Sequence, residues 1–311
     1  MDNPPTDSAE PTLRRQRAAH WPPDNRIYIA QVTGSQISAL DINSGAIETI
    51  SAKGGDIVAP PDDLAFDPRG NMFATEVMDG RVSMRGSDGR SKVLRADLPS
   101  ANGITVYQGR LFINECREGG RLMELDLDGG PPRILAEDLP MPNAMEVGPD
   151  GLLYFPPSWV PTRSGGSHRT AAPHEVVATG LGVPDSVKFD AAGQIVSTQV
   201  HSGQVLRIDP PRTGVKTVLA DLNPGLDNCT FVGDRLFVSS FTGEVTEILS
   251  PPGRTSTVLP GGLNWPLDLT VATDGRLHIA DGTYFYRLGS SGALETIAML
   301  FTPRLSPGLS E

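Results

Sequence analysis

The sequence predicts an all-β fold, a β-propeller of four-stranded antiparallel blades, and three observations lead to this prediction. One apolar pattern recurs at nearly constant spacing along the chain. Short runs with period-two alternation and Gly or Asp turns surround each copy, whereas apolar residues at helical spacing are absent. The chain of 311 residues also contains 34 Gly and 28 Pro, as a protein with many turns requires.

The recurring pattern is a six-residue segment of alternating apolar residues, usually introduced by Gly, Asp or Arg. Its third positions lie 39 to 45 residues apart over the whole chain. The copies are Arg26–Gln31, Asn71–Glu76, Arg110–Glu115, Leu152–Pro157, Gln194–Gln199, Arg235–Ser240 and Arg276–Asp281. One apolar run precedes most copies and two follow, so each unit has four short strands. Such a unit cannot bury both of its faces alone, and repeated units therefore stack around an axis.

Seven blades are favoured, and six are the alternative. Six copies have a clear first strand, but the earliest does not. Its inner strand comes either from Arg17–Trp21 or from the C-terminal run Leu300–Leu305, which would close the ring and leave no open edge. We expect a polar N-terminal tail over 1–16, a single propeller domain over 17–300, and a C-terminal tail or ring-closing segment over 301–311.

Composition excludes several classes of protein. The formal net charge of −11 argues against a surface for nucleic acid or anionic membrane. No apolar run reaches the length of a membrane span, and the N-terminus lacks the apolar core of a secretory signal. The two cysteines, Cys116 and Cys229, form no CxxC and are expected in the core. These features favour a cytoplasmic protein.

Oxygen-bearing side chains recur where the first strand of each blade begins. In a propeller these positions meet around the central channel, on the face where the second strands end. The residues concerned are Asp62, Asn102, Asn143, Asp185 and Asp227, with Asp63 and Asn228 beside two of them, whereas the last blade has Leu267. Converging oxygen ligands suit a hard divalent cation such as Ca²⁺, with Mg²⁺, Mn²⁺ and Zn²⁺ as alternatives.

A bound cation would also relieve repulsion between the acidic side chains at the channel mouth. Two carboxylates 4 Å apart repel by about 4 kcal/mol at intermediate dielectric. The opposing interpretation is that Asp and Asn only form turns there, because their side chains bond nearby backbone N–H groups. Turn formation alone does not require the same register in five blades, which favours the metal site.

Further candidates lie on the same face of the disc. Glu76 and Glu115 end second strands and are predicted to contact substrate; otherwise they are polar blade ends facing solvent. His201, in the following loop of its blade, is a candidate auxiliary base or simply a solvated residue. Trp159 lies in Ser158–His174, the longest departure from the repeat, and is a candidate substrate contact or part of a flexible insertion.

The blade phrases PDDLAFDPRGNMFATE, SANGITVYQGRLFINE, VPDSVKFDAAGQ and LDNCTFVGDRLFVSSFTGEV resemble the senescence marker protein/gluconolactonase family of lactone-hydrolysing propellers. In that family, Asn-Gly and Pro-Asp-Gly phrases supply ligands to a catalytic divalent metal, and a carboxylate acts as base. Asn102 matches the Asn-Gly phrase. Asp185 matches the Pro-Asp phrase, although Ser186 stands where Gly is usual. Asp227 and Asn228 are similar to the adjacent Asp–Asn ligands of the more distant paraoxonases.

The sequence also departs from the family pattern. The family has a Glu ligand near its N-terminus, whereas RRQRAAHW here contains no acid, and Asp62 replaces it only under a shifted alignment. The family is six-bladed, while seven copies occur here. Seven blades with strand ends such as ATE and INE are similar to the virginiamycin B lyase type, a metal-dependent lyase that opens a lactone by elimination.

These observations leave three functions open. The first is a metal-dependent hydrolase of a small lactone or ester, with Asp227 or Asp185 as general base. The second is a metal-dependent lyase on the same scaffold, and the third a non-catalytic propeller that binds a ligand or a protein. The sequence contains no P-loop, no HExxH and no GxSxG. The five histidines have no metal-ligand spacing, and His278 is expected to be packed in a strand.

Overall fold

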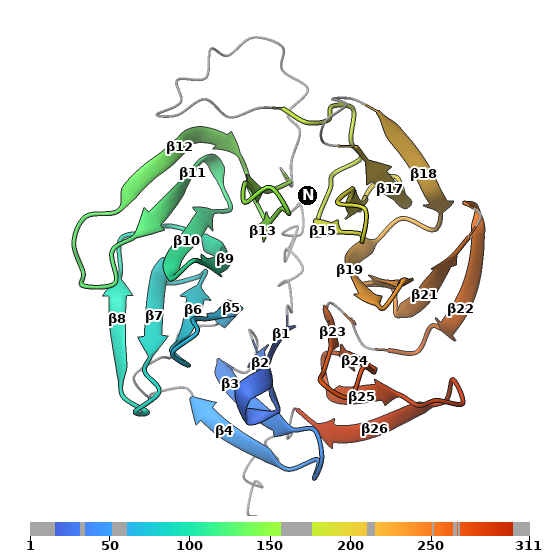
Figure 1. The fold of residues 1–311 in the computed structure, drawn as a ribbon, viewed down its shortest axis with the longest axis horizontal. Helices are drawn as coiled ribbons and strands as arrows, with labels where there is room; N and C mark the ends of the chain where they lie inside the picture. Colours follow the sequence, from blue (N-terminus) through green and yellow to red (C-terminus); the bar gives the residue numbers. More distant parts are fainter. Residues whose placement is uncertain are drawn as a thin grey trace, which may run out of the picture.

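The structure is a computed structural model that describes residues 16–31, 35–51, 61–156, 176–209, 215–250, 252–263, 266 and 268–300. Within these ranges it has 26 β-strands and one 3₁₀ turn, Pro22–Asp24. The strands form small antiparallel sheets arranged in a ring around one axis (Figure 1). The predicted all-β propeller is therefore confirmed. No helix in the described ranges is long and apolar enough to cross a bilayer.

Six of the described sheets have four strands, and one has two. The first sheet consists of β1 (Gln16–Trp21), β2 (Arg26–Gln31), β3 (Gln36–Asp41) and β4 (Ile47–Ser51). The second consists of β5 (Pro61–Phe66), β6 (Met72–Glu76), β7 (Arg81–Arg85) and β8 (Ser91–Arg95). The third consists of β9 (Ala101–Tyr107), β10 (Arg110–Glu115), β11 (Glu118–Leu125) and β12 (Arg133–Pro140). The two-stranded sheet consists of β13 (Glu146–Val147) and β14 (Leu153–Tyr154). The fifth sheet consists of β15 (Lys188–Phe189), β16 (Ile195–Thr198), β17 (Gln204–Ile208) and β18 (Lys216–Asp221). The sixth consists of β19 (Leu226–Val232), β20 (Arg235–Ser240), β21 (Glu244–Leu249) and β22 (Arg254–Pro260). The seventh consists of β23 (Asp268–Val271), β24 (Leu277–Ala280), β25 (Tyr284–Leu288) and β26 (Leu294–Met299).

Each sheet is built from consecutive strands, and each strand pairs with the next in antiparallel orientation. The first strand of every sheet lies nearest the axis, and in the four-stranded sheets the last lies at the rim (Figure 1). This is the arrangement expected of propeller blades. It places the beginnings of the first strands together on one face of the disc.

Burial is nearly complete in the second strands of several blades. All residues of β6 and β24 are buried, as are all but the first residue of β10 and of β20. Neighbouring blades cover both faces of these strands, so side chains on either side are removed from water. The rim strand β22 is exposed over its first four residues.

The N-terminal segment supplies the inner strand of the first blade. β1 pairs with β2 along its whole length, from Gln16 opposite Gln31 to Trp21 opposite Arg26. Of the two sources considered from the sequence, the segment containing Arg17–Trp21 is therefore correct. The ends of the ring also meet directly, because Gln31 Nε2 donates to the carbonyl oxygen of Leu300 at 2.7 Å. The tails 1–15 and 301–311 lie outside the described residues.

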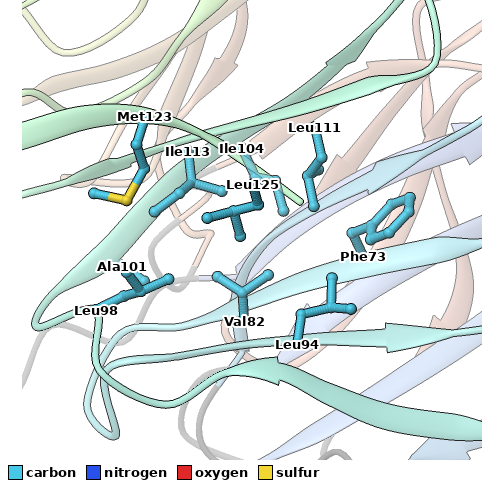
Figure 2. Close-up of a cluster of buried hydrophobic side chains, with 10 residues drawn as sticks. All are labelled: Phe73, Val82, Leu94, Leu98, Ala101, Ile104, Leu111, Ile113, Met123 and Leu125. Atoms are coloured by element: carbon cyan, nitrogen blue, oxygen red, sulfur yellow. The ribbon is translucent and has the colours of Figure 1, made fainter. Parts of the chain in front are cut away.

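The hydrophobic core is divided among the blade junctions. In the cluster shown in Figure 2, Phe73, Val82 and Leu94 of one blade pack against residues of the next, among them Leu111 and Ile113. Because each cluster joins two sheets, a blade buries apolar side chains against its neighbours.

Leu111→Ala tests this dependence. Leu111 is completely buried, and we expect its truncation to lower the free energy of unfolding by about 2–5 kcal/mol, through lost transfer energy and a residual cavity. Leu152→Ala is the matched control, because that side chain is 61% exposed and its loss should change stability by less than about 0.5 kcal/mol. Urea denaturation measures both. Equal effects would contradict the packing described here.

Candidate functional site

A cavity of about 450 Å³ lies along the axis of the ring. First strands of six sheets and Trp21 at the end of β1 line it. Its wall is polar where the first strands begin, with Asp63, Ser186, Asn228 and Asp268. Among the described residues, this end of the cavity wall therefore offers polar groups, whereas apolar residues such as Phe66 and Ile104 line the rest.

Four of the predicted metal ligands form two pairs at the starts of the first strands. Asn102 Nδ2 donates to Asp62 Oδ2 at 2.7 Å, and Asn143 Nδ2 donates to Asp185 Oδ1 at 2.6 Å. Each pair joins neighbouring sheets, and all four side chains are at most 7% exposed. Polar groups this deeply buried require partners, and the pairs provide them in part.

Each asparagine in these pairs has an amide oxygen that is not used. Asn102 Oδ1 and Asn143 Oδ1 are both buried and have no hydrogen-bond partner in the part of the chain that the structure describes. The orientation of each amide follows from its partner, because a carboxylate can accept only from Nδ2. Two acceptor atoms are thus buried on successive blades with unused lone pairs.

The expected crowding of bare carboxylates is not what the structure shows. Asp62 and Asp185 each accept a hydrogen bond from an asparagine of an adjacent blade. No group of three or more His, Cys, Asp or Glu side chains within the described ranges is placed to hold a metal ion. Any cation at this mouth would therefore need the asparagine oxygens in addition to carboxylates.

The third predicted group, Asp227 with Asn228, is arranged differently. Both residues are half-buried. Asn228 Nδ2 donates to Asp268 Oδ1 at 2.8 Å, and Asn228 Oδ1 accepts the backbone N–H of Cys229 at 2.8 Å. Both ends of this amide are used within the protein, unlike those of Asn102. The predicted role of Asn228 as a ligand stays untested, and we leave it out of the donor set proposed below.

Glu76 and Glu115 occupy the ends of second strands, as predicted, but both are completely buried. Glu76 is paired with Arg81, whose Nε lies 3.0 Å from it. Glu115 is paired with Arg121, whose Nε lies 2.9 Å away, and with Arg117 at 3.0 Å. They therefore do not face solvent, and arginines of their own blades hold their carboxylates. Their predicted contact with substrate stays a prediction.

The remaining candidates are His201, Trp159 and His278. His201 is exposed in the turn between β16 and β17, and it is not among the residues that line the cavity. Of the six predicted metal ligands, Asn228 alone is among those lining residues. Trp159 and the Ser158–His174 loop lie outside the described residues. His278 is 1% exposed and stacks on Phe285 with ring centroids 5.7 Å apart, so the prediction that it is packed is confirmed.

An ion pair in the channel wall was not predicted from the sequence. Lys188 Nζ lies 2.9 Å from Glu146 Oε2, and both residues line the cavity. Burial acts to lower the pKa of Lys188, but the Glu146 carboxylate overrides it and holds that pKa above its ordinary value. Their equivalent positions could have predicted the pair, because Glu146 and Lys188 each stand three residues after the first-strand residues Asn143 and Asp185 of neighbouring blades.

Asp268, the partner of Asn228, was missed for a similar reason. The phrase of the last blade begins with Leu267 where another blade has Asp62, so its acid stands at the second position of the phrase and not at the first. Asp268 corresponds instead to Asp63, which likewise follows the first-strand start of its blade. Both carboxylates accept the next backbone N–H at 2.9 Å. The shared phrase Asp-Leu at 63–64 and 268–269 was the signal that could have identified the residue.

Cys229 lies directly behind the channel wall and is completely buried. Burial raises the pKa of its thiol to about 11, against the opposing effect of its contact with Ser186 Oγ at 3.4 Å. At neutral pH the sulfur is therefore protonated. This agrees with the expectation that Cys229 is a core residue and not a nucleophile.

Thiol labelling in a Cys116→Ser background tests this conclusion, because Cys229 is then the only cysteine. Since one pKa unit changes the thiolate fraction about tenfold, we expect native protein at pH 8 to react with Ellman's reagent at least about 100-fold more slowly than urea-unfolded protein. Reaction should accelerate as the pH rises toward 11. Equal rates for folded and unfolded protein would contradict the burial of this thiol.

Comparisons with solved structures agree with the propeller architecture. A streptogramin B lyase aligns with a TM-score of 0.69 at 17% identity, covering 91% of this chain and 93% of that one. A gluconolactonase from Xanthomonas campestris aligns with a TM-score of 0.51 at 21% identity, covering 71% and 83%. A functionally unknown protein from Desulfotomaculum acetoxidans gives 0.61 at 12% identity, covering 88% and 95%. At these identities the likeness concerns the fold.

The sequence itself carries the family relationship. No match was found among curated proteins. The profile of the SMP-30/Gluconolactonase/LRE-like region, however, matches residues 6–242, which is more than half of the chain. The match includes every first-strand start from Asp62 to Asp227. The chain therefore belongs to the SMP-30/gluconolactonase/LRE-like family of propellers.

Proposed function

We propose that this protein is a metal-dependent hydrolase of a lactone or a related ester, with its active site at the mouth of the central channel. The observation that carries the proposal is the pair of buried amide oxygens, Asn102 Oδ1 and Asn143 Oδ1, that have no hydrogen-bond partner among the described residues. Leaving a buried polar atom unsatisfied costs about 1–3 kcal/mol. An electron-pair acceptor bound at these oxygens would remove that cost.

The donor set fits a hard divalent cation. Amide and carboxylate oxygens are the ligands that Ca²⁺ takes, and Asn102, Asn143, Asp62, Asp185 and Asp227 offer both kinds. Asp62 and Asp185 would serve in two ways, because each orients an asparagine and each adds negative charge. Family membership supports the proposal, since the matched range 6–242 contains Asn102 and Asp185, which resemble the ligand phrases of the family.

A cation bound there would supply Lewis acidity to the ester carbonyl and acidity to a bound water. The chain itself would supply the base. Asp227 is half-buried, whereas Asp185 is only 7% exposed and uses Oδ1 to accept from Asn143. We therefore assign proton abstraction from the attacking water to Asp227 before Asp185. The channel cavity below the mouth would hold the small substrate.

Asn143→Ala tests the metal site. The variant removes one of the two unused amide oxygens, and we expect Ca²⁺ affinity in isothermal titration calorimetry to fall by at least about tenfold, or 1.4 kcal/mol. Asn71→Ala is the control, because Asn71 also donates to an aspartate at 2.7 Å but follows the far end of β5. Its affinity should match the wild type. A wild-type protein that binds no divalent cation would contradict the proposal.

Activity on a panel of lactones and esters tests the reaction. We expect turnover that EDTA abolishes and added Ca²⁺ restores, and a loss of at least about 100-fold in kcat for Asp227→Asn, which has no base. Reaction in H₂¹⁸O should place ¹⁸O in the acid product. An unlabelled product with a new carbon–carbon double bond would instead show the lyase reaction. Cation binding without turnover of any ester would favour the ligand-binding propeller.

A further inference from the structure

Asn114 connects the two asparagines of the proposed site through their backbones. Its Oδ1 accepts the N–H of Gly103 at 3.0 Å, and its Nδ2 donates to the carbonyl oxygen of Asn143 at 2.6 Å. Gly103 directly follows Asn102. One side chain, completely buried, thus holds the backbone beside both unused amide oxygens.

The local strand geometry explains why the N–H of Gly103 needs a partner outside the β-ladder. The register between β9 and β10 shifts between Ile113 and Glu115, so that Asn114 itself has no partner in β9. Such a bulge removes backbone groups from the ladder, and buried groups of this kind require another partner. The amide of Asn114 supplies both a donor and an acceptor at this point.

Gly103 allows the two blades to approach this closely. A Cβ atom added to Gly103 would lie 2.4 Å from the carbonyl oxygen of Asn143 and 2.9 Å from Asn114 Nδ2. Neither distance is tolerable for a carbon atom, and the nearer obstacle is backbone that cannot rotate away. The spacing between the Asn102 and Asn143 segments therefore depends on the absence of a side chain here.

At two other blade junctions, a threonine hydroxyl near the end of the second strand makes the two backbone bonds that Asn114 makes here. Thr75 Oγ1 accepts the N–H of Asp63 at 3.1 Å and donates to the carbonyl oxygen of Asn102 at 2.7 Å. Thr198 Oγ1 likewise joins the N–H of Ser186 to the carbonyl oxygen of Asp227. A hydroxyl makes both bonds through one atom, whereas the amide of Asn114 spreads them over two. The junction between the two unused oxygens is thus built differently from these two.

We propose that Asn114 is a positioning residue that, together with Gly103, sets the relative placement of the Asn102 and Asn143 amide oxygens and thereby the affinity and size selectivity of the cation site. This inference rests on the proposed function, because it assumes that a cation binds there. Ca²⁺ takes oxygen ligands at about 2.3–2.6 Å and Mg²⁺ at about 2.0–2.1 Å, so the two ions report on the spacing of the oxygens.

The decisive experiment compares Asn114→Asp and Asn114→Thr with the wild type in calorimetric titrations with Ca²⁺ and with Mg²⁺. Asn114→Asp keeps the acceptor for Gly103 but cannot donate to Asn143. Asn114→Thr reproduces the hydroxyl used at the other junctions, and it serves if the first variant does not fold. We expect Ca²⁺ affinity to fall by about 10-fold or more in either variant, with a changed ratio of Ca²⁺ to Mg²⁺ affinity.

Asn71→Asp is the matched control, because it makes the same chemical change in an asparagine that donates to an aspartate at 2.7 Å in the turn after β5. It should lower the melting temperature but leave both affinities unchanged. Asn114 variants with wild-type affinities and only a lower melting temperature would overturn the inference and leave the proposed function intact. A wild-type protein that binds neither ion would overturn both.

Discussion

No blade of this protein can bury its second strand without a blade on either side. Second strands such as β6 and β10 are buried on both faces, and the hydrophobic clusters that cover them lie between sheets, as in the group that joins Phe73 to Leu111 and Ile113. Closing the ring is thus a condition for the core to exist. The same requirement brings the inner strands together around one axis and places their first residues in a single small region.

The polar residues of this region are stabilised across blade junctions in the same way as the core. Asp62 with Asn102, Asn143 with Asp185, and Asn228 with Asp268 each join neighbouring sheets. The first two pairs leave an amide oxygen unsatisfied, whereas the third does not. A mouth that served only to close the ring would gain stability from satisfying every amide. The two unsatisfied oxygens of Asn102 and Asn143 are therefore the observation on which the proposed cation site rests.

The fold was predictable because its signal is repeated. The 39- to 45-residue spacing and the alternation within each copy determine blades, and even the irregular first strand near Trp21 was among the alternatives considered. The register of acidic and amide residues at the strand starts was predictable for the same reason. Their pairing was not, because it depends on the directions in which bulged backbone turns the side chains.

Other features depend on contacts that no repeat reveals. Glu76 and Glu115 are at the predicted strand ends, but their burial follows from arginines five and six residues later in the same blade. The Lys188–Glu146 pair joins residues 42 positions apart, and each looks like an ordinary charged strand residue in the sequence. Such side-chain partners are determined by the shape of the channel, which only the folded ring defines.

The way the ends of the ring meet has a consequence for how such chains can be rearranged. No described sheet contains strands from both ends of the chain. The junction of the first and last sheets includes an apolar cluster that contains Ile29 and Phe285, and the hydrogen bonds from Gln31 to Leu300 and from Thr273 to Asn25. The junction of the first and last sheets is therefore a boundary between two complete sheets, like the other blade boundaries. A circular permutant that begins at another blade boundary would form the same ring of blades, provided that a linker joined the two ends.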